Sequence, residues 1–184
     1  DLDADFVGFS LHKWLCAPIG SGAIWIRPSR LADIELCMGS TMFPPDDTRS
    51  RSSVGTVNFA ATMTVPSAIA FHERIGGLKK QQLLQALRTY WVERVRDIRG
   101  LEILTPEEPA RYGAVTSFRL PRMRDYAEAQ RMAKLLLDKH QILTVARRGL
   151  DKGAVVRVTP TLYNTTAELD RLVSALRAES AAFV

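Results

Sequence analysis

The sequence is poor in cysteine and has no long hydrophobic run. Its 184 residues include only two cysteines, Cys16 and Cys37, which are too few for a disulfide framework or a metal cluster and are typical of a reducing compartment. No apolar stretch approaches the roughly 20 residues that a membrane span needs. Residues 1–5 are acidic and lack the charged-then-apolar pattern of a signal peptide. We therefore expect a cytoplasmic protein without a membrane partner, although the first residue is not Met, and a missing N-terminus leaves an export signal open.

The sequence also lacks a basic run with interleaved aromatic residues. Its net charge of +5 raises nucleic acid as a partner. The arginines, however, alternate with acidic residues, as in Glu93-Arg94 and Arg96-Asp97, and this mixture is typical of a solvated surface. We therefore expect a mildly basic surface and no nucleic-acid partner.

The first 76 residues contain few strands. Predicted strands at 6–11 and 23–27 flank a turn-rich segment. They are followed by a predicted short helix at 28–37, a long loop at 38–57, and a helix at 58–75 that Asn58 caps and Pro66 kinks. Because a two-stranded sheet is marginal alone, this part has too few strands for a sheet of its own.

The rest of the chain alternates helices and strands. Gly76-Gly77 breaks the preceding helix, and a longer amphipathic helix is predicted at 78–98. Thr165 and Glu168 form a capping box for the last helix. The remaining predicted strands are 101–104, 114–120, 142–146 and 155–159, and the remaining predicted helices are 126–139 and 167–178. These elements are enough for a small α/β domain with a mixed sheet and covering helices.

Lys13 is the first candidate for chemistry. It follows a predicted strand and precedes a turn rich in glycine and proline, and open α/β sheets bind their ligands at such strand ends. A lysine amine is a nucleophile only when it is neutral, which requires burial or a nearby cation. The apolar neighbours Leu11, Trp14, Leu15 and Ile19 are candidates for that burial. On spacing alone, a solvent-facing loop lysine is the simpler interpretation.

The segment around Lys13 resembles a known cofactor-binding segment. Residues 5–27, and above all the run HKWLCAP at 12–18, are similar to the cofactor-lysine segment of class V aminotransferase-fold enzymes, and most similar to their isopenicillin N epimerase-like branch. These are fold type I enzymes that use pyridoxal 5'-phosphate (PLP). The resemblance implies that Lys13 forms the Schiff base with PLP. His12 beside it would either bind the cofactor phosphate or serve a structural role.

A second segment, Gly55-Thr56 ahead of a helix, resembles the Gly-Thr segment of the same family. In the family this segment often reaches the phosphate of the cofactor in a partner subunit, so the resemblance implies a homodimer. A hydroxyl and free amides at a helix start favour an anion, and a plain helix cap is the alternative. Arg49 and Arg51, on the preceding loop, are expected to be solvated rather than to meet phosphate or substrate.

A third segment, residues 155–170, resembles the family's Arg-Val-Thr-Pro strand, the turn after it and the last helix. The resemblance implies that Arg157 binds the α-carboxylate of the substrate. An arginine inside an apolar strand needs a partner, and its planar fork suits a carboxylate. The alternative is an internal ion pair with a nearby acid.

The resemblance extends over residues 5–176 and covers the C-terminal half of such an enzyme. It implies an α/β chain that is the C-terminal part of a fold type I PLP-dependent transferase, with a remnant of the PLP-binding large-domain sheet at 1–76 and a small C-terminal α/β domain at 77–184. The implied function is an aminotransferase class V-like enzyme that acts on an amino-acid substrate by transamination, epimerisation or elimination. Desulfurase activity through a thiol of the smaller domain is disfavoured, because no cysteine follows Cys37, whereas selenocysteine lyase-like chemistry stays open. The alternative is a catalytically inactive fragment or interaction module derived from this fold.

Overall fold

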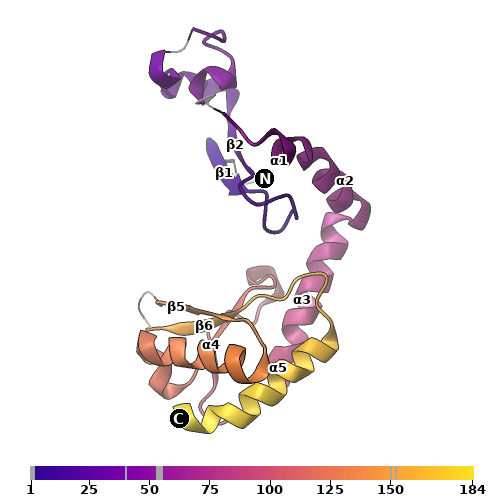
Figure 1. Ribbon diagram of the computed structural model, residues 1–184, viewed down its shortest axis with the longest axis vertical. Coiled ribbons are helices and arrows are strands. Elements are labelled where there is room, and N and C mark those ends of the chain that lie inside the picture. Colours follow the sequence, from indigo (N-terminus) through magenta and orange to yellow (C-terminus); the bar gives the residue numbers. More distant parts are fainter. Residues whose placement is uncertain (1–2, 40, 53–55, 150, 152) are drawn as a thin grey trace. The chain divides into compact units, whose positions relative to one another are not determined.

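The computed structural model describes residues 3–39, 41–52, 56–149, 151 and 153–184. The chain forms two compact units, Asp1–Ile75 and Gly76–Val184. The first unit contains a two-stranded sheet and the second a four-stranded sheet. Figure 1 shows the helices and strands of each unit. The assignment of the two parts to a PLP-binding domain and a small domain stays a prediction.

The first unit contains an antiparallel pair of strands, β1 (Phe6–Ser10) and β2 (Gly22–Ile26). Both lie within one residue of their predicted bounds. Successive side chains of a strand point to opposite faces, so each face of the pair has its own set of residues. Both faces carry large apolar side chains that are 44% to 59% exposed, Phe6 and Ile24 on one face and Phe9 and Trp25 on the other.

Between β2 and the first α-helix the chain has only short 3-10 helices among its described residues. The helix predicted at 28–37 forms as the shorter 3-10 helix Pro28–Asp33. The loop predicted at 38–57 overlaps two further 3-10 turns, Cys37–Gly39 and Thr48–Arg51. The prediction of a long irregular segment here is therefore correct for the part that the structure describes.

The helix predicted at 58–75 forms as two helices, α1 (Phe59–Met63) and α2 (Val65–Ile75). Asn58 caps α1 as predicted, because its side-chain oxygen accepts a hydrogen bond from the amide of Ala61 at 3.1 Å. Pro66 lies in the first turn of α2, where its missing N–H leaves no bond unmade. The predicted kink is therefore a break between two helices.

The second unit begins with α3 (Gly77–Glu93), which ends earlier than the predicted residue 98. Gly76 separates it from α2 with a φ of 85°, a left-handed conformation that favours glycine. After Glu93 the chain continues in turns, and Val95 and Ile98 still pack on the core. The apolar spacing therefore identified the correct core face but not the end of the helix.

The sheet of the second unit has the order β3-β4-β6-β5, and every neighbouring pair is antiparallel. The mixed sheet that we predicted is therefore wrong. The strands β4 and β5, joined through a helix, run in the same direction, but β6 lies between them and pairs with both. The strands are β3 (Glu102–Ile103), β4 (Thr116–Arg119), β5 (Val145–Arg147) and β6 (Val155–Val158).

The helices α4 (Tyr126–His140) and α5 (Thr166–Glu179) lie within one residue of their predicted bounds. The predicted capping box of α5 is confirmed. The hydroxyl of Thr165 accepts from the amide of Glu168 at 3.3 Å, and the Glu168 carboxylate accepts from the amide of Thr165 at 2.7 Å. This cap fixes where the chain turns from β6 into α5.

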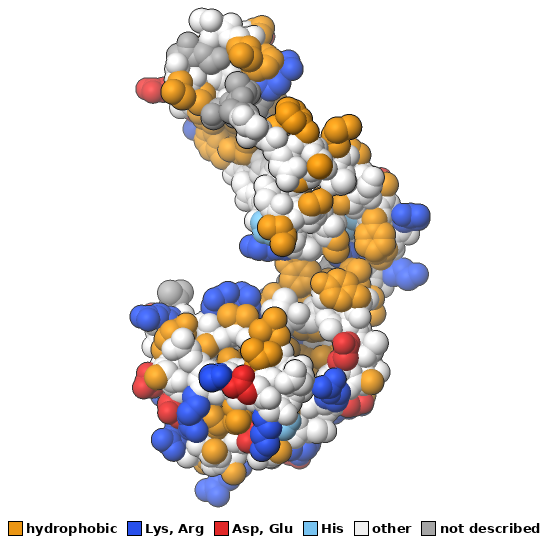
Figure 2. All heavy atoms as spheres, in the orientation of Figure 1, with side chains coloured by type: hydrophobic (Ala, Val, Ile, Leu, Met, Phe, Trp, Pro, Cys, Tyr) orange, Lys and Arg blue, Asp and Glu red, His pale blue; other side chains and the backbone are white. Residues whose placement is uncertain are grey.

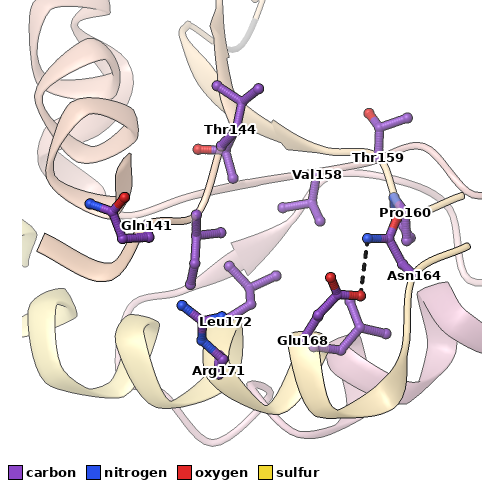
Figure 3. Close-up of a pocket in the computed structure, with 12 residues that line it drawn as sticks. Gln141, Thr144, Val158, Thr159, Pro160, Asn164, Glu168, Arg171 and Leu172 are labelled. Atoms are coloured by element: carbon purple, nitrogen blue, oxygen red, sulfur yellow. Dashed lines mark hydrogen bonds between the residues drawn. The ribbon is translucent and has the colours of Figure 1, made fainter. Parts of the chain in front are cut away.

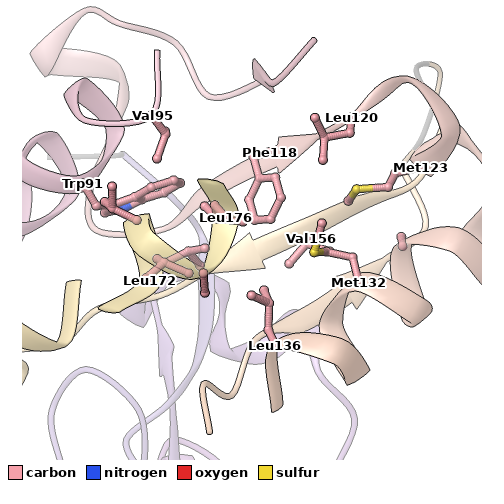
Figure 4. Packing of buried hydrophobic residues seen from close by; sticks show 14 of the residues in the cluster. Trp91, Val95, Phe118, Leu120, Met123, Met132, Leu136, Val156, Leu172 and Leu176 are labelled. Atoms are coloured by element: carbon pink, nitrogen blue, oxygen red, sulfur yellow. The ribbon is translucent and has the colours of Figure 1, made fainter. Parts of the chain in front are cut away.

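The core of the second unit lies between the helices and one face of the sheet (Figure 4). Trp91 of α3 and Phe118 of β4 meet edge to face, with ring centroids 6.3 Å apart. Met132, Val156 and Leu176 extend the cluster from α4, β6 and α5, and all of these side chains are fully buried. The second unit thus contains a closed hydrophobic core.

The opposite face of this sheet, here called the outer face, carries Ser117, Val145, Arg147 and Arg157. Phe118 and Val156 point into the core, so the residues next to them in each strand point away from it. Ser117 and Val145 lie directly opposite Arg157 on the two neighbouring strands.

Candidate functional site

Lys13 lies on a hydrogen-bonded turn that directly follows β1. The carbonyl of Lys13 accepts a hydrogen bond from the amide of Cys16 at 3.1 Å, and the amide of Leu11 donates to the carbonyl of Ser21 at 3.1 Å. Cys16 adopts a φ of 64°, which residues other than glycine rarely do, so its surroundings must hold it there. The Lys13 side chain is exposed and has no ion pair or hydrogen bond within the described residues. The turn therefore presents a free amine from a fixed backbone.

The apolar neighbours of Lys13 do not bury its amine, and the solvent-facing lysine that spacing alone favours is the arrangement found in this chain. Ile19 is 88% exposed and Trp14 is 39% exposed. Leu11 is buried, but it packs with alanines of the turn and of α2 rather than around the amine. The side chains of a tight turn point in different directions, so apolar neighbours in sequence do not form a pocket. Burial that would neutralise the amine must come from groups outside this turn.

His12 ties the lysine turn to the start of β2. Its Nδ1 lies 3.0 Å from the carbonyl oxygen of Ser21, and only a protonated nitrogen can donate to that oxygen. In the neutral ring Nε2 then carries the lone pair. The contact supports a structural role for His12, whereas a contact with a cofactor phosphate stays a prediction.

Of the Gly55-Thr56 pair, Gly55 lies outside the described residues. Thr56 is exposed and stands two residues before the capping residue Asn58. Because Asn58 rather than Thr56 accepts the amide of Ala61, the hydroxyl of Thr56 does not cap the helix. The role of this pair at a cofactor phosphate stays a prediction.

The loop arginines Arg49 and Arg51 are engaged within their own loop. The Nε of Arg49 donates to both carboxylate oxygens of Asp47 at 3.0 Å, and this hydrogen bonding lowers the pKa of Asp47 to about 2. Arg51 donates to the carbonyl of Leu31 at 3.2 Å and to the hydroxyl of Ser50 at 3.0 Å. Arg49 is exposed, as expected, whereas Arg51 is half-buried and hydrogen-bonded rather than solvated. That neither arginine meets phosphate or substrate stays a prediction.

Arg157 is half-buried on the outer face of the second unit. Its Nε is buried and has no hydrogen-bond partner in the structure, and no ion pair of Arg157 is found among the described residues. The internal ion pair considered as an alternative is therefore absent from that part of the chain. Only the Nε of this guanidinium is enclosed, and a buried donor without a partner is costly, so this arrangement favours a hydrogen-bond acceptor such as an anionic ligand.

The predicted site residues fall into two groups. Lys13, His12 and Thr56 belong to the first unit, and Arg157 belongs to the second. Each group is fixed within its own unit, by the lysine turn in one and by the paired strands in the other.

A hollow of about 250 Å³ lies in the second unit between the end of β6 and the start of α5 (Figure 3). Its polar groups already serve the fold. The amide of Asn164 donates to the capping carboxylate of Glu168 at 3.3 Å, and Arg171 donates to the carbonyl of His140 at 3.0 Å. The buried hydroxyl of Thr144 has no hydrogen-bond partner among the described residues, and the charged side chains that line the hollow, Glu168 and Arg171, already bond within the fold. We do not regard this hollow as the site.

Sequence reasoning missed Arg147, the last residue of β5. The predicted strand stopped at 146, so Arg147 was left outside the sheet. It is exposed, it shares the outer face with Arg157, and within the described ranges it has no ion pair. The register with β6 places Arg147 on the same face as Arg157, and residues 142–146 give no strict alternation from which the end of the strand could be predicted.

Comparison with known proteins supports the resemblance seen in the sequence. The sequence model described as aminotransferase class-V matches residues 1–172. Isopenicillin N epimerase of Amycolatopsis lactamdurans is 32% identical over 195 residues, which cover 96% of this chain and 47% of that protein. A probable cysteine desulfurase of Streptomyces coelicolor is 29% identical over 196 residues, which cover 95% of this chain and 44% of that protein. The chain thus spans about half the length of the curated relatives it matches.

A solved structure has the same fold over almost the whole chain. The apo structure of a cysteine desulfurase from Thermococcus onnurineus NA1 superimposes with a TM-score of 0.78 at 20% identity. The superposition covers 97% of this chain and 48% of that one. Both units therefore have counterparts within one larger protein.

Proposed function

The chain belongs to the class-V aminotransferase family, and on that basis we propose that it is the C-terminal part of a PLP-dependent enzyme that acts on an amino-acid substrate. The observation that carries the proposal is the turn of Lys13. It offers an unpaired amine on a backbone fixed at both ends, at the position where the family resemblance expects the cofactor lysine.

The residues of the lysine turn suit an aldehyde cofactor. Lys13 would hold the aldehyde of PLP, and His12 would keep the turn in place through its bond to Ser21. When bound, PLP withdraws electrons from a bond at the substrate Cα. The amine of Lys13, once released by the substrate, would remove or return the Cα proton as a general base. Its exposure in this chain means that the burial needed for this chemistry has to come from other groups.

Arg157 would bind the α-carboxylate of the substrate. Its buried Nε and the planar fork beside it offer hydrogen-bond donors in a fixed orientation, and a carboxylate would satisfy them. The strand pairing on both sides keeps the arginine backbone rigid. Gly55 and Thr56 would contribute to a phosphate site in a homodimer.

The reaction type within the family is transamination, epimerisation or elimination. One relative is named as an epimerase and another as a probable cysteine desulfurase, so proteins of similar sequence carry names of both kinds of reaction. We propose that sulfur transfer through a thiol of the second unit is not its activity, because both cysteines, Cys16 and Cys37, lie in the first unit. Within its described residues the chain has no helix long and apolar enough to cross a membrane, and a cytoplasmic location is part of the proposal.

A second candidate function is an inactive module derived from this fold. The observation that favours it is the exposure of the Lys13 amine and of large apolar side chains in the first unit, such as Ile19 at 88%. A lysine turn that stays exposed to solvent would hold PLP weakly.

Absorbance after addition of PLP distinguishes the two candidates. We expect a band near the visible edge, and borohydride reduction followed by peptide mass analysis should place the PLP on Lys13. The matched control is Lys79→Ala, which removes another exposed lysine and should leave the band unchanged, whereas Lys13→Ala should abolish it. The spectrum should be recorded for this chain and for any longer polypeptide that contains it. Labelling of Lys79 and Lys13 to the same extent in every polypeptide would refute the assignment.

A further inference from the structure

The outer face of the second unit carries more positive charge than the sheet neutralises. By the alternation of the strands, this face also carries Arg119 in addition to Arg147 and Arg157. Arg119 is paired with Glu102 directly across from it, with Nη2 and Oε2 2.6 Å apart. Glu102 is the one acidic residue in the four strands. Two arginines of this face, Arg147 and Arg157, are therefore left without a counter-charge among the described residues.

The register places these two arginines close together. Val145 lies directly opposite Arg157, and Arg147 is two residues further along β5 on the same face. Such diagonal neighbours have Cβ atoms roughly 7–8 Å apart, which is within reach of two long side chains. Like charges at this spacing repel each other, so the pair is most stable when anionic groups lie between or beside the two guanidiniums.

The two arginines differ in how they meet a ligand. Arg157 is half-buried with its Nε enclosed, whereas Arg147 is exposed at the end of its strand. The register therefore places Arg147 within reach of the outer end of a ligand whose first carboxylate binds Arg157. Ser117, opposite Arg157 on the other side, brings a small polar side chain rather than a bulky apolar one.

We propose that the substrate is a dicarboxylic amino acid, with Arg147 binding the carboxylate of its side chain. The proposal rests on the proposed function, in which Arg157 binds the α-carboxylate. Arg147 is then the residue that selects an acidic side chain over a neutral one, since a planar guanidinium pairs with a carboxylate but gains little from an amide.

The test compares two substrates of equal size that differ by one charge, glutamate and glutamine. In the polypeptide that turns over amino acids, Arg147→Gln should raise KM for glutamate by about 10-fold to 100-fold and change KM for glutamine less than about 2-fold. Arg157→Gln should raise KM for both. The series aspartate, glutamate and 2-aminoadipate gives the side-chain length that reaches Arg147.

The matched control is Arg148→Gln, which removes the same charge from the next residue. Arg148 lies over the ring of Tyr126, with its guanidinium carbon 4.7 Å from the ring centroid, so its side chain is engaged away from the outer face. The substitution Arg148→Gln should leave the KM values for glutamate and glutamine unchanged. An equal effect of Arg147→Gln on glutamate and glutamine, no effect on either, or an equal effect of Arg148→Gln would overturn the proposal.

A binding measurement without PLP separates this proposal from the proposed function. Glutarate and its monoamide are titrated into the chain, and chemical shifts of the amides in β5 and β6 are followed by NMR. Tighter binding of glutarate that is lost in Arg147→Gln but kept in Arg148→Gln supports the dicarboxylate site, even if no Lys13-dependent absorbance is found. Equal binding of the two compounds counts against it, whatever the outcome with PLP.

Discussion

The two units bury their apolar side chains to very different extents. In the second unit Trp91, Phe118 and Leu176 are fully buried in one cluster. In the first unit Phe59 is 68% exposed and Met38 is 96% exposed. Figure 2 shows the same contrast, with hydrophobic side chains gathered on the first unit and charged side chains of both signs spread over the second.

This difference separates a unit that closes its own core from one that does not. The second unit has a four-stranded sheet with helices on one face, which is sufficient to enclose a core. The first unit has two strands with apolar side chains on both faces, and such a pair is marginal alone. Large exposed apolar patches mark surfaces that are covered in a larger assembly. We therefore expect the lysine turn to gain its burial when the first unit is covered.

The largest expected effect comes from the removal of Trp91, a fully buried tryptophan of the second unit. Trp91→Ala should lower the free energy of unfolding of the second unit by about 3 kcal/mol, the lower end of the range for buried aromatics. The lower end applies because the Nε1 of Trp91 is buried without a partner in the structure, so its removal also relieves an unsatisfied donor. Urea unfolding followed by far-UV circular dichroism measures the loss.

The matched change in the first unit is Trp25→Ala. Trp25 is 47% exposed in β2, so its removal should cost less than about 1 kcal/mol. If the two substitutions cost the same, the first unit would have a closed core of its own, and the contrast drawn between the units would be wrong.

Local sequence patterns predicted most of the fold. The bounds of α4, α5, β1 and β2 were correct to within one residue, because caps, turns and apolar spacing are local signals. The predicted family is confirmed by the match to the class-V aminotransferase model, and the predicted fold by a solved structure that shares it over almost the whole chain. The mixed sheet was wrong, because the insertion of β6 between β4 and β5 depends on contacts between distant residues that no local pattern encodes.

The site was predicted less completely. Lys13 and Arg157 could be selected because their segments carry a family resemblance. The exposure of the Lys13 side chain could not be predicted, because it depends on what packs across the turn rather than on the neighbours of Lys13 in the sequence. Arg147, which we propose as the residue that binds the side-chain carboxylate, was not selected for a related reason. Its position on the outer face follows from the register with β6, which joins residues on separate strands.

An intermediate effect is expected from the helix caps of the two units. Thr165→Ala removes the side-chain half of the capping box of α5 and should destabilise the second unit by about 1 kcal/mol. Asn58→Ala removes the cap of the five-residue helix α1 and should leave the second unit unchanged. Hydrogen exchange of the amides in β4 and β6 measures both effects. Thr166→Ala, one residue inside α5, is the control, and a loss equal to that of Thr165→Ala would show that the cap is not the cause.

The smallest expected effect is a pH dependence in the second unit. The pKa of Glu179 lies below its usual 4.5, first because Lys139 donates to it at 2.7 Å and then because His140 lies 2.9 Å away. A carboxyl group whose pKa is lowered by folding adds stability above its unfolded pKa, and this stability is lost as the pH falls through the folded pKa. Glu179→Gln should therefore lower the urea midpoint at about pH 5 more than at about pH 3.

The control is Glu73→Gln in α2, which removes a carboxylate from the first unit and should leave both urea midpoints of the second unit unchanged. Parallel pH profiles for the wild type and Glu179→Gln would contradict this role, and a response to Glu73→Gln would show that the two units do not unfold independently.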